Sequence, residues 1–210
     1  MLPLFGQIHL ASFLLPATTG MIRFAKLNRA MRILTLLSVL ACFNIAAQYL
    51  LAAWRIKNYF ISDYYRVVEI SLLCAVFQFS VGSKGPRIVL RALGILFIVI
   101  WIVDMIYFHN PELLNSGMAM TSRIFLIVMS LVTLQAATKD EKPHLLERPI
   151  FWVGIGVVLY SSGTLLVLGL SNQLLKLGQT YFVVAWHINW SLLIAANLFY
   201  TKGMLCKFQV

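Results

Sequence analysis

The chain has 210 residues, of which 60% are hydrophobic and only 11% are charged, whereas soluble domains carry about 25% charged residues. A soluble fold of this size could not cover so much apolar surface, so the composition excludes a soluble enzyme or a soluble nucleic-acid-binding domain. The net charge of +10 does not indicate nucleic acid, because the Lys and Arg residues stand in short clusters between apolar runs. The sequence therefore predicts a single-domain integral membrane protein that has the lipid bilayer as a partner.

Seven apolar stretches have the length of roughly 20 residues that a membrane-spanning helix needs. Short polar segments rich in Gly, Pro and Asn separate them. The sequence predicts an all-α polytopic bundle with seven transmembrane helices, over residues 2–22, 31–54, 61–82, 89–108, 117–138, 150–170 and 179–200. The first stretch is the weakest, since Gln7, His9 and two prolines dilute it. Without it, six spans would leave both termini on the same side.

The distribution of Lys and Arg predicts the orientation, because cytoplasmic segments next to spans are enriched in basic residues. One side of the seven-span arrangement would carry five of them: Arg55, Lys57, Arg66, Arg123 and Lys176. The other side would carry twelve: Arg23, Lys26, Arg29, Arg32, Lys84, Arg87, Arg91, Lys139, Lys142, Arg148, Lys202 and Lys207. We expect the side with twelve to be cytoplasmic, so the N-terminus lies outside and the C-terminus inside.

Polar side chains within the spans are the most informative feature, since a charge near the centre of a spanning helix costs about 2.5 to 3.5 kcal/mol. Seven such residues fall at similar depth in the outer halves of spans one, two, three, four, five and seven: His9, Gln48, Arg66, Glu69, Asp104, Arg123 and His187. Helical spacing adds Asn44 to the face of Gln48 and Trp190 to the face of His187. Together these nine residues predict a polar chamber that opens outward and binds a ligand.

Within this chamber Glu69 is the strongest candidate for a functional residue, because it lies roughly 13 Å below the outer end of its span. Arg66 and Arg123 would then hold a carboxylate or a phosphate through paired hydrogen bonds. A structural alternative stays open. Two ion pairs that join the acids Glu69 and Asp104 to these two arginines would use the same side chains without any ligand.

No catalytic, metal or cofactor motif accompanies the polar layer. The sequence has no HExxH, no HxxxH, no cysteine pair at metal-ligand spacing, no GxSxG, no Walker loop and no Gly-rich dinucleotide turn. We therefore expect no catalytic residue, no metal and no cofactor. The small residues Gly154, Gly156 and Gly163 of span six predict close helix packing and not a site.

Three segments carry a resemblance: Asp63–Glu69, Arg148–Trp152 with its continuation to Tyr160, and Asn197–Tyr200. In these segments the chain resembles small bacterial polytopic inner-membrane proteins of uncharacterised function. The resemblance implies a location in the bacterial cytoplasmic membrane, and it implies no catalytic or binding residue.

The one-sided polar layer and the lack of catalytic motifs favour a receptor-like or sensory membrane module. Such a module would bind a small polar or amphiphilic ligand in the chamber and signal through a membrane protein partner, which the basic cytoplasmic turns would contact. One alternative is an intramembrane lipid-modifying enzyme, with Glu69 or Asp104 as general base and His9 or His187 assisting. A second alternative is a small-solute transporter, which would need polar groups through the inner half as well.

Overall fold

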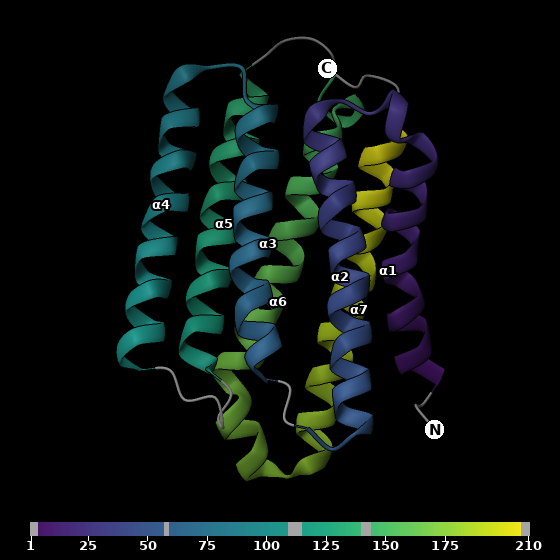
Figure 1. Ribbon diagram of the computed structural model, residues 1–210, viewed down its shortest axis with the longest axis vertical. Helices are drawn as coiled ribbons and strands as arrows, with labels where there is room; N and C mark the ends of the chain where they lie inside the picture. The colour runs from purple at the N-terminus through teal and green to yellow at the C-terminus, as the bar shows by residue number, and fades with distance from the viewer. Residues whose placement is uncertain (1–3, 57–58, 109–114, 140–143, 207–210) are drawn as a thin grey trace.

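The protein is described by a computed structural model over residues 4–56, 59–108, 115–139 and 144–206 (Figure 1). These residues form seven α-helices and two short 3-10 helices, and they contain no β-strand. The helices are α1 (Leu4–Arg23), α2 (Arg29–Ala53), α3 (Tyr59–Ser80), α4 (Lys84–Tyr107), α5 (Ser116–Thr138), α6 (Pro149–Leu177) and α7 (Gln179–Leu205). They run alternately up and down, so that α1 begins and α7 ends at opposite ends of the bundle (Figure 1). The prediction of an all-α bundle is confirmed.

Five of the described helices are long and apolar enough to cross a membrane: α2, α4, α5, the Pro149–Leu170 part of α6, and α7. The protein is therefore an integral membrane protein. Helices α1 and α3 are not among these five. In α3 the cause is the charge of Asp63, Arg66 and Glu69, which all stand in its first half.

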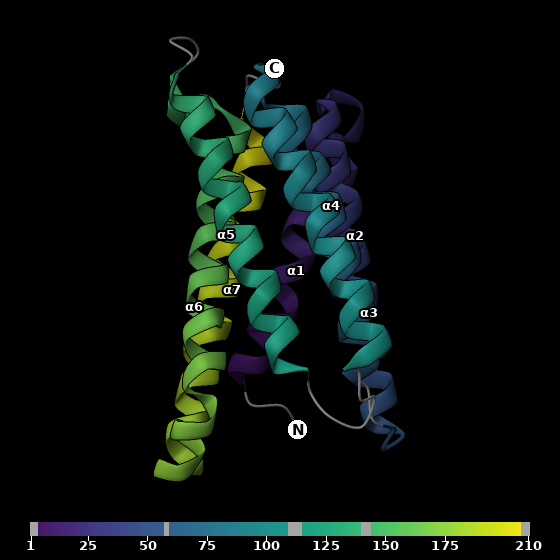
Figure 2. The same ribbon diagram turned by 90° about the vertical axis from the view of Figure 1, so that its left-hand side faces the viewer.

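Six helices close a ring in the order α1, α2, α3, α5, α6 and α7, and α7 packs back against α1. Helix α4 lies outside this ring and packs on α3 and α5, at the left edge of Figure 1 and nearest the viewer in Figure 2. Only one narrow stripe of α4 is buried, formed by Leu90, Gly94 and Phe97. The rest of its surface is left for lipid.

Local signals set the ends of the helices. The Asn28 side chain caps α2 by accepting a hydrogen bond from the Met31 amide at 2.9 Å, and Asn115 caps α5 by accepting from the Met118 amide at 3.0 Å. Pro149 begins α6, where its missing amide hydrogen has no cost. Gly178 separates α6 from α7 with a φ of +132°, a conformation that only glycine adopts readily.

The two halves of the bundle differ in character. In the half that holds the end of α7, called the packed half below, large apolar side chains are completely buried: Met31, Leu34, Phe77, Leu90, Met129, Val153 and Met204. The opposite half, which holds the start of α1, is called the polar half. The apolar contacts of the packed half hold the ring together, because they remove side chains from lipid contact and interlock neighbouring helices.

Helix α3 shows how one face serves both halves. Its buried stripe follows three- and four-residue spacing through Asp63, Arg66, Ile70, Leu73 and Phe77. The stripe is charged near the start of the helix and apolar near its end. The same face therefore lies in the polar half at one end and in the apolar core at the other.

The contact between α6 and α7 in the packed half depends on Gly203. A Cβ at this position would lie 2.9 Å from the Pro149 carbonyl oxygen, which is backbone and cannot turn aside. We predict that Gly203→Ala lowers the free energy of unfolding by about 1 to 3 kcal/mol, because it forces the two helices apart. Gly85→Ala is the control, since its Cβ meets nothing within 4 Å. Unfolding titrations in detergent micelles measure both, and equal stability of the two variants would contradict the prediction.

Candidate functional site

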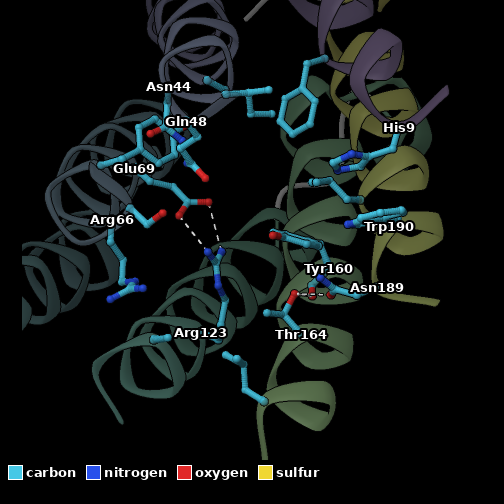
Figure 3. A pocket seen from close by; sticks show the side chains of 18 of the residues that line it. His9, Asn44, Gln48, Arg66, Glu69, Arg123, Tyr160, Thr164, Asn189 and Trp190 are labelled. Atoms are coloured by element: carbon cyan, nitrogen blue, oxygen red, sulfur yellow. Dashed lines mark hydrogen bonds and ion pairs between the residues drawn. The ribbon is translucent and has the colours of Figure 1, made fainter. Parts of the chain in front are cut away.

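A cavity of about 330 Å³ lies inside the ring, in the polar half (Figure 3). All six helices of the ring contribute side chains to its wall. Seven of the nine residues that the sequence singled out line this cavity: His9, Asn44, Gln48, Arg66, Glu69, Arg123 and Trp190. Glu69, Arg123 and Trp190, which are between 54 and 121 positions apart in the chain, are thus brought around one space. The remaining two, Asp104 and His187, do not line it.

The helices around the cavity differ from the expected set in one respect: α6 lines the cavity in place of α4. Span four was expected to contribute and does not, because α4 packs on the outer faces of α3 and α5. Helix α6 takes its place through Tyr160, Thr164 and Leu168. The packing role predicted for the glycines of α6 also exists, since a Cβ at Gly154 would lie 2.8 Å from Leu134 of α5. Helix α6 therefore packs tightly against α5 near Gly154, and the next turns of α6 line the cavity.

Glu69 and Arg123 form a two-pronged ion pair across α3 and α5. Nη1 and Nη2 of Arg123 donate to Oε1 and Oε2 of Glu69, each at 3.1 Å (Figure 3). The side chains are only 15% and 11% exposed, so Glu69 faces the interior and not the lipid. The Arg123 guanidinium also lies 5.0 Å from the ring centre of Tyr160, within range of a cation–π contact. This part of the wall carries two charges that cancel.

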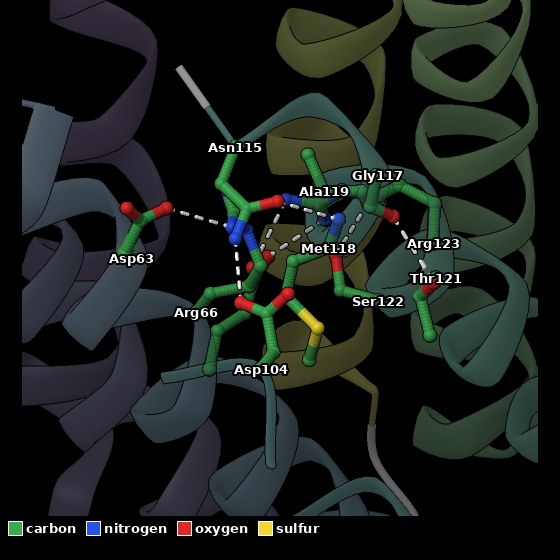
Figure 4. Close-up of polar contacts among 11 residues, drawn as sticks. Asp63, Arg66, Asp104, Asn115, Gly117, Met118, Ala119, Thr121, Ser122 and Arg123 are labelled. Carbon is green, nitrogen blue, oxygen red and sulfur yellow. Dashed lines mark hydrogen bonds and ion pairs between the residues drawn. The ribbon is translucent and has the colours of Figure 1, made fainter. Parts of the chain in front are cut away.

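The other two predicted charges belong to a polar cluster formed by residues of α3, α4 and the start of α5 (Figure 4). The guanidinium of Arg66 points away from Arg123 and donates to Asp63 at 2.9 Å. Asp104 accepts a hydrogen bond of 2.5 Å from the side chain of Asn115. Of the two ion pairs considered from the sequence, Glu69 with Arg123 therefore exists, while Arg66 and Asp104 have other partners.

Part of this cluster could have been found from spacing. Asp63 precedes Arg66 by three residues, which places the two side chains on the same helix face. Asn115 could not have been found in this way, because its contact with Asp104 depends on how α4 and α5 pack.

An aromatic wall closes the side of the cavity formed by α1 and α7. The rings of His9 and Trp190 stack with centres 5.2 Å apart and an angle of 17°, and Phe13 meets His9 edge-on at 5.5 Å. His187 packs against Trp190 and Phe5, at 5.4 Å from each ring centre, so it supports the wall without lining the cavity. The sequence placed both His187 and Trp190 in the chamber; the two rings do pack together, but only Trp190 lines the cavity.

Two buried polar groups in the wall lack hydrogen-bond partners among the described residues. Both ring nitrogens of His9 and the amide oxygen of Asn44 are in this state, although His9 is only 9% exposed. A buried polar atom without a partner costs about 1 to 3 kcal/mol, so proteins rarely keep one without a reason. These atoms mark where a bound molecule would gain hydrogen bonds.

Several cavity residues escaped the sequence analysis. Thr164 donates a hydrogen bond of 2.7 Å to the Asn189 side chain and so joins α6 to α7 at the wall. Tyr65 and Tyr160 also line the cavity. Single hydroxyl, amide or aromatic groups within apolar spans have no spacing signal that separates them from ordinary packing residues.

No family model, no curated protein and no solved structure matches the chain. The residues described here also contain no group of three or more His, Cys, Asp or Glu side chains that could hold a metal ion. The function must therefore be argued from the cavity itself.

The Glu69–Arg123 pair yields a direct test. We predict that Arg123→Met lowers the free energy of unfolding by about 3 kcal/mol, because it leaves a carboxylate unpaired inside the bundle. The double variant Glu69→Gln with Arg123→Met should recover most of this loss, since no charge remains unpaired. Arg91→Met, at an exposed position on α4, is the control. Unfolding titrations in mixed micelles measure all three. A double variant as unstable as the single one would show that the charges are not coupled.

Proposed function

We propose that the chain is a receptor-like membrane module that binds a small polar or amphiphilic ligand in the ring cavity and signals through a membrane protein partner. The observation that carries the proposal is the shape of the interior. The polar half holds a cavity whose wall combines apolar and aromatic side chains with several polar ones, and the packed half closes it with apolar side chains such as Phe77, Met129 and Met204. A cavity that is closed at one end and lined by apolar side chains with a few polar groups is the form expected of a binding site.

The packed half argues against a transport path. Its buried hydroxyl groups are already engaged with backbone carbonyls: Thr35 with Met31, Ser38 with Leu34, Ser130 with Gly154, and Thr133 with Met129. The hydroxyl hydrogens would have to leave these carbonyls to donate to a passing solute, so the hydroxyl groups could act toward it only as acceptors. A small-solute transporter is therefore less well supported than a binding module.

The cavity also supports binding better than catalysis. Both oxygens of Glu69 are held by Arg123, and Asp104 lies outside the cavity, so neither carboxylate is positioned as a free general base. Four side chains were considered for a lipid-modifying enzyme: Glu69, Asp104, His9 and His187. Among them, only His9 lines the cavity and also has polar atoms without a hydrogen-bond partner among the described residues. A lone imidazole without an orienting partner favours recognition of a ligand.

The proposal includes seven spans in a bacterial cytoplasmic membrane, with the N-terminus outside and the C-terminus inside. Helices α1 and α3 run beside the five apolar helices over much of the bundle (Figure 1), which supports their inclusion as spans. The helix ends of the packed half carry many basic residues: Arg23, Lys26, Arg29, Arg32, Lys84, Arg87, Arg91, Lys139, Arg148 and Lys202. Basic residues favour the cytoplasmic side, where they would contact lipid head groups or the signalling partner.

Reporter fusions test this orientation. In bacterial cells, a green fluorescent protein at the C-terminus should fluoresce, whereas alkaline phosphatase at the same place should be inactive, because the phosphatase folds only outside the cytoplasm. Fusions in the connection between α2 and α3 should give the reverse result. Active phosphatase at the C-terminus would overturn the proposed orientation.

Filling the cavity tests ligand binding. Ala41 lines the cavity, whereas Ala46, on the same helix, is exposed. We predict that a panel of small polar and amphiphilic compounds contains at least one that raises the unfolding temperature of the protein in lipid nanodiscs. Ala41→Phe should abolish that shift, because the larger side chain occupies the ligand's space, and Ala46→Phe should retain it. A shift that both variants retain, or no shift in the parent protein, would contradict a ligand-binding role for the cavity.

A further inference from the structure

A groove between α1 and α2 adjoins the main cavity. A second cavity of about 250 Å³ shares His9, Ile45, Gln48 and Trp190 with the first one. Three further residues line only this second space, which is called the side groove below: Leu10, Tyr49 and Ala52. Because four residues line both spaces, the two cavities lie directly next to each other.

The side groove opens toward the lipid-facing surface. Farther toward the packed half, α1 and α2 pack tightly: a Cβ at Gly20 would overlap the Thr35 side chain, and the Cys42 thiol donates to the Phe13 carbonyl at 3.5 Å. The groove lies on the other side of these contacts, where Tyr49 is 40% exposed. Its own residues are mostly apolar and suit a hydrocarbon chain.

The charges around the main cavity favour an uncharged head group. Glu69 and Arg123 neutralise each other, and the guanidinium of Arg66 is held by Asp63. A ligand with a net charge would have to break one of these pairs or remain uncompensated in a low-dielectric space.

The unengaged polar atoms define what this head must offer. A neutral imidazole has one donor and one acceptor nitrogen, and an amide oxygen only accepts. His9 and Asn44 supply these groups from opposite sides of the cavity (Figure 3). A hydroxyl group both donates and accepts, so a head with two hydroxyls can satisfy both residues.

We propose that the ligand is an uncharged, hydroxyl-bearing amphiphile of the outer leaflet, such as a monoacylglycerol. Its head hydrogen-bonds to His9 and Asn44 in the main cavity, and its hydrocarbon chain leaves through the side groove. This inference rests on the proposed function and adds the class of ligand and its route of entry. The amphiphile would enter from the membrane and not from water.

Photo-cross-linking tests the inference on the full chain in phosphatidylcholine nanodiscs. The probe is a monoacylglycerol with a diazirine in its acyl chain, and mass spectrometry maps the labelled residues. We expect saturable labelling of the α1 and α2 segments around Leu10, Tyr49 and Ala52. Unlabelled monooleoylglycerol should compete. Oleate, which has the same chain and a charged head, and glycerol, which lacks the chain, should compete at least about tenfold less well.

Matched variants separate the two parts of the site. Ala52→Trp fills the side groove and His9→Phe removes the imidazole nitrogens, so each should reduce saturable labelling by about tenfold. Ala46→Trp, which faces away from both cavities, should leave it unchanged. His9→Phe keeps a ring against Trp190 and loses no hydrogen bond of the side chain, so its unfolding temperature without ligand should equal or exceed that of the parent.

The outcomes distinguish this inference from the proposed function. Labelling spread evenly over the lipid-facing surface, equal competition by oleate, or insensitivity to Ala52→Trp would overturn the inference. If a water-soluble polar compound stabilises the parent but not Ala41→Phe while the groove stays unlabelled, the amphiphile is wrong and the binding module stands. If no compound stabilises the parent and no saturable labelling occurs, both proposals fall.

Discussion

Hydrocarbon does not solvate a charged side chain, so each ionisable group within this bundle needs a partner inside the protein. The pair of Glu69 with Arg123 meets this need across α3 and α5. It requires these two helices to be direct neighbours in the polar half. Helix α4, which connects them in sequence, must then lie outside, and the remaining helices close the ring around the cavity. The order of the helices and the position of the cavity are both consistent with this single requirement.

The two halves of the bundle have different roles. The packed half supplies interlocking apolar contacts, and the polar half can keep a cavity because those contacts already hold the ring together. Helix α3 shows the division within one element, since its buried face passes from Asp63 and Arg66 to Leu73 and Phe77. Because apolar side chains fill the packed half, the cavity is closed at that end. This closure favours binding over transport.

The unengaged atoms of His9 and Asn44 are a cost that packing alone does not explain. An apolar residue stacked on Trp190 would fill the position of His9 without leaving buried nitrogens unpaired. Sites that bind ligands commonly keep such groups, because the free energy lost in the empty protein is regained when the ligand forms the hydrogen bonds. The side groove adds an apolar extension next to these polar atoms, and this combination suits an amphiphile.

The sequence by itself determined the all-α membrane class, the approximate helix boundaries and seven residues of the cavity wall. These follow from local properties: the length of apolar runs, and the cost of placing Glu69, Arg123 or His9 within them. Only the tertiary structure decided which side chains meet, because partners such as Asp104 and Asn115 depend on helix packing. It also placed α4 outside the ring and brought Tyr160 of α6 to the cavity. An apolar span has the same composition whether it faces lipid, a neighbour or a cavity, so its sequence alone does not distinguish these positions.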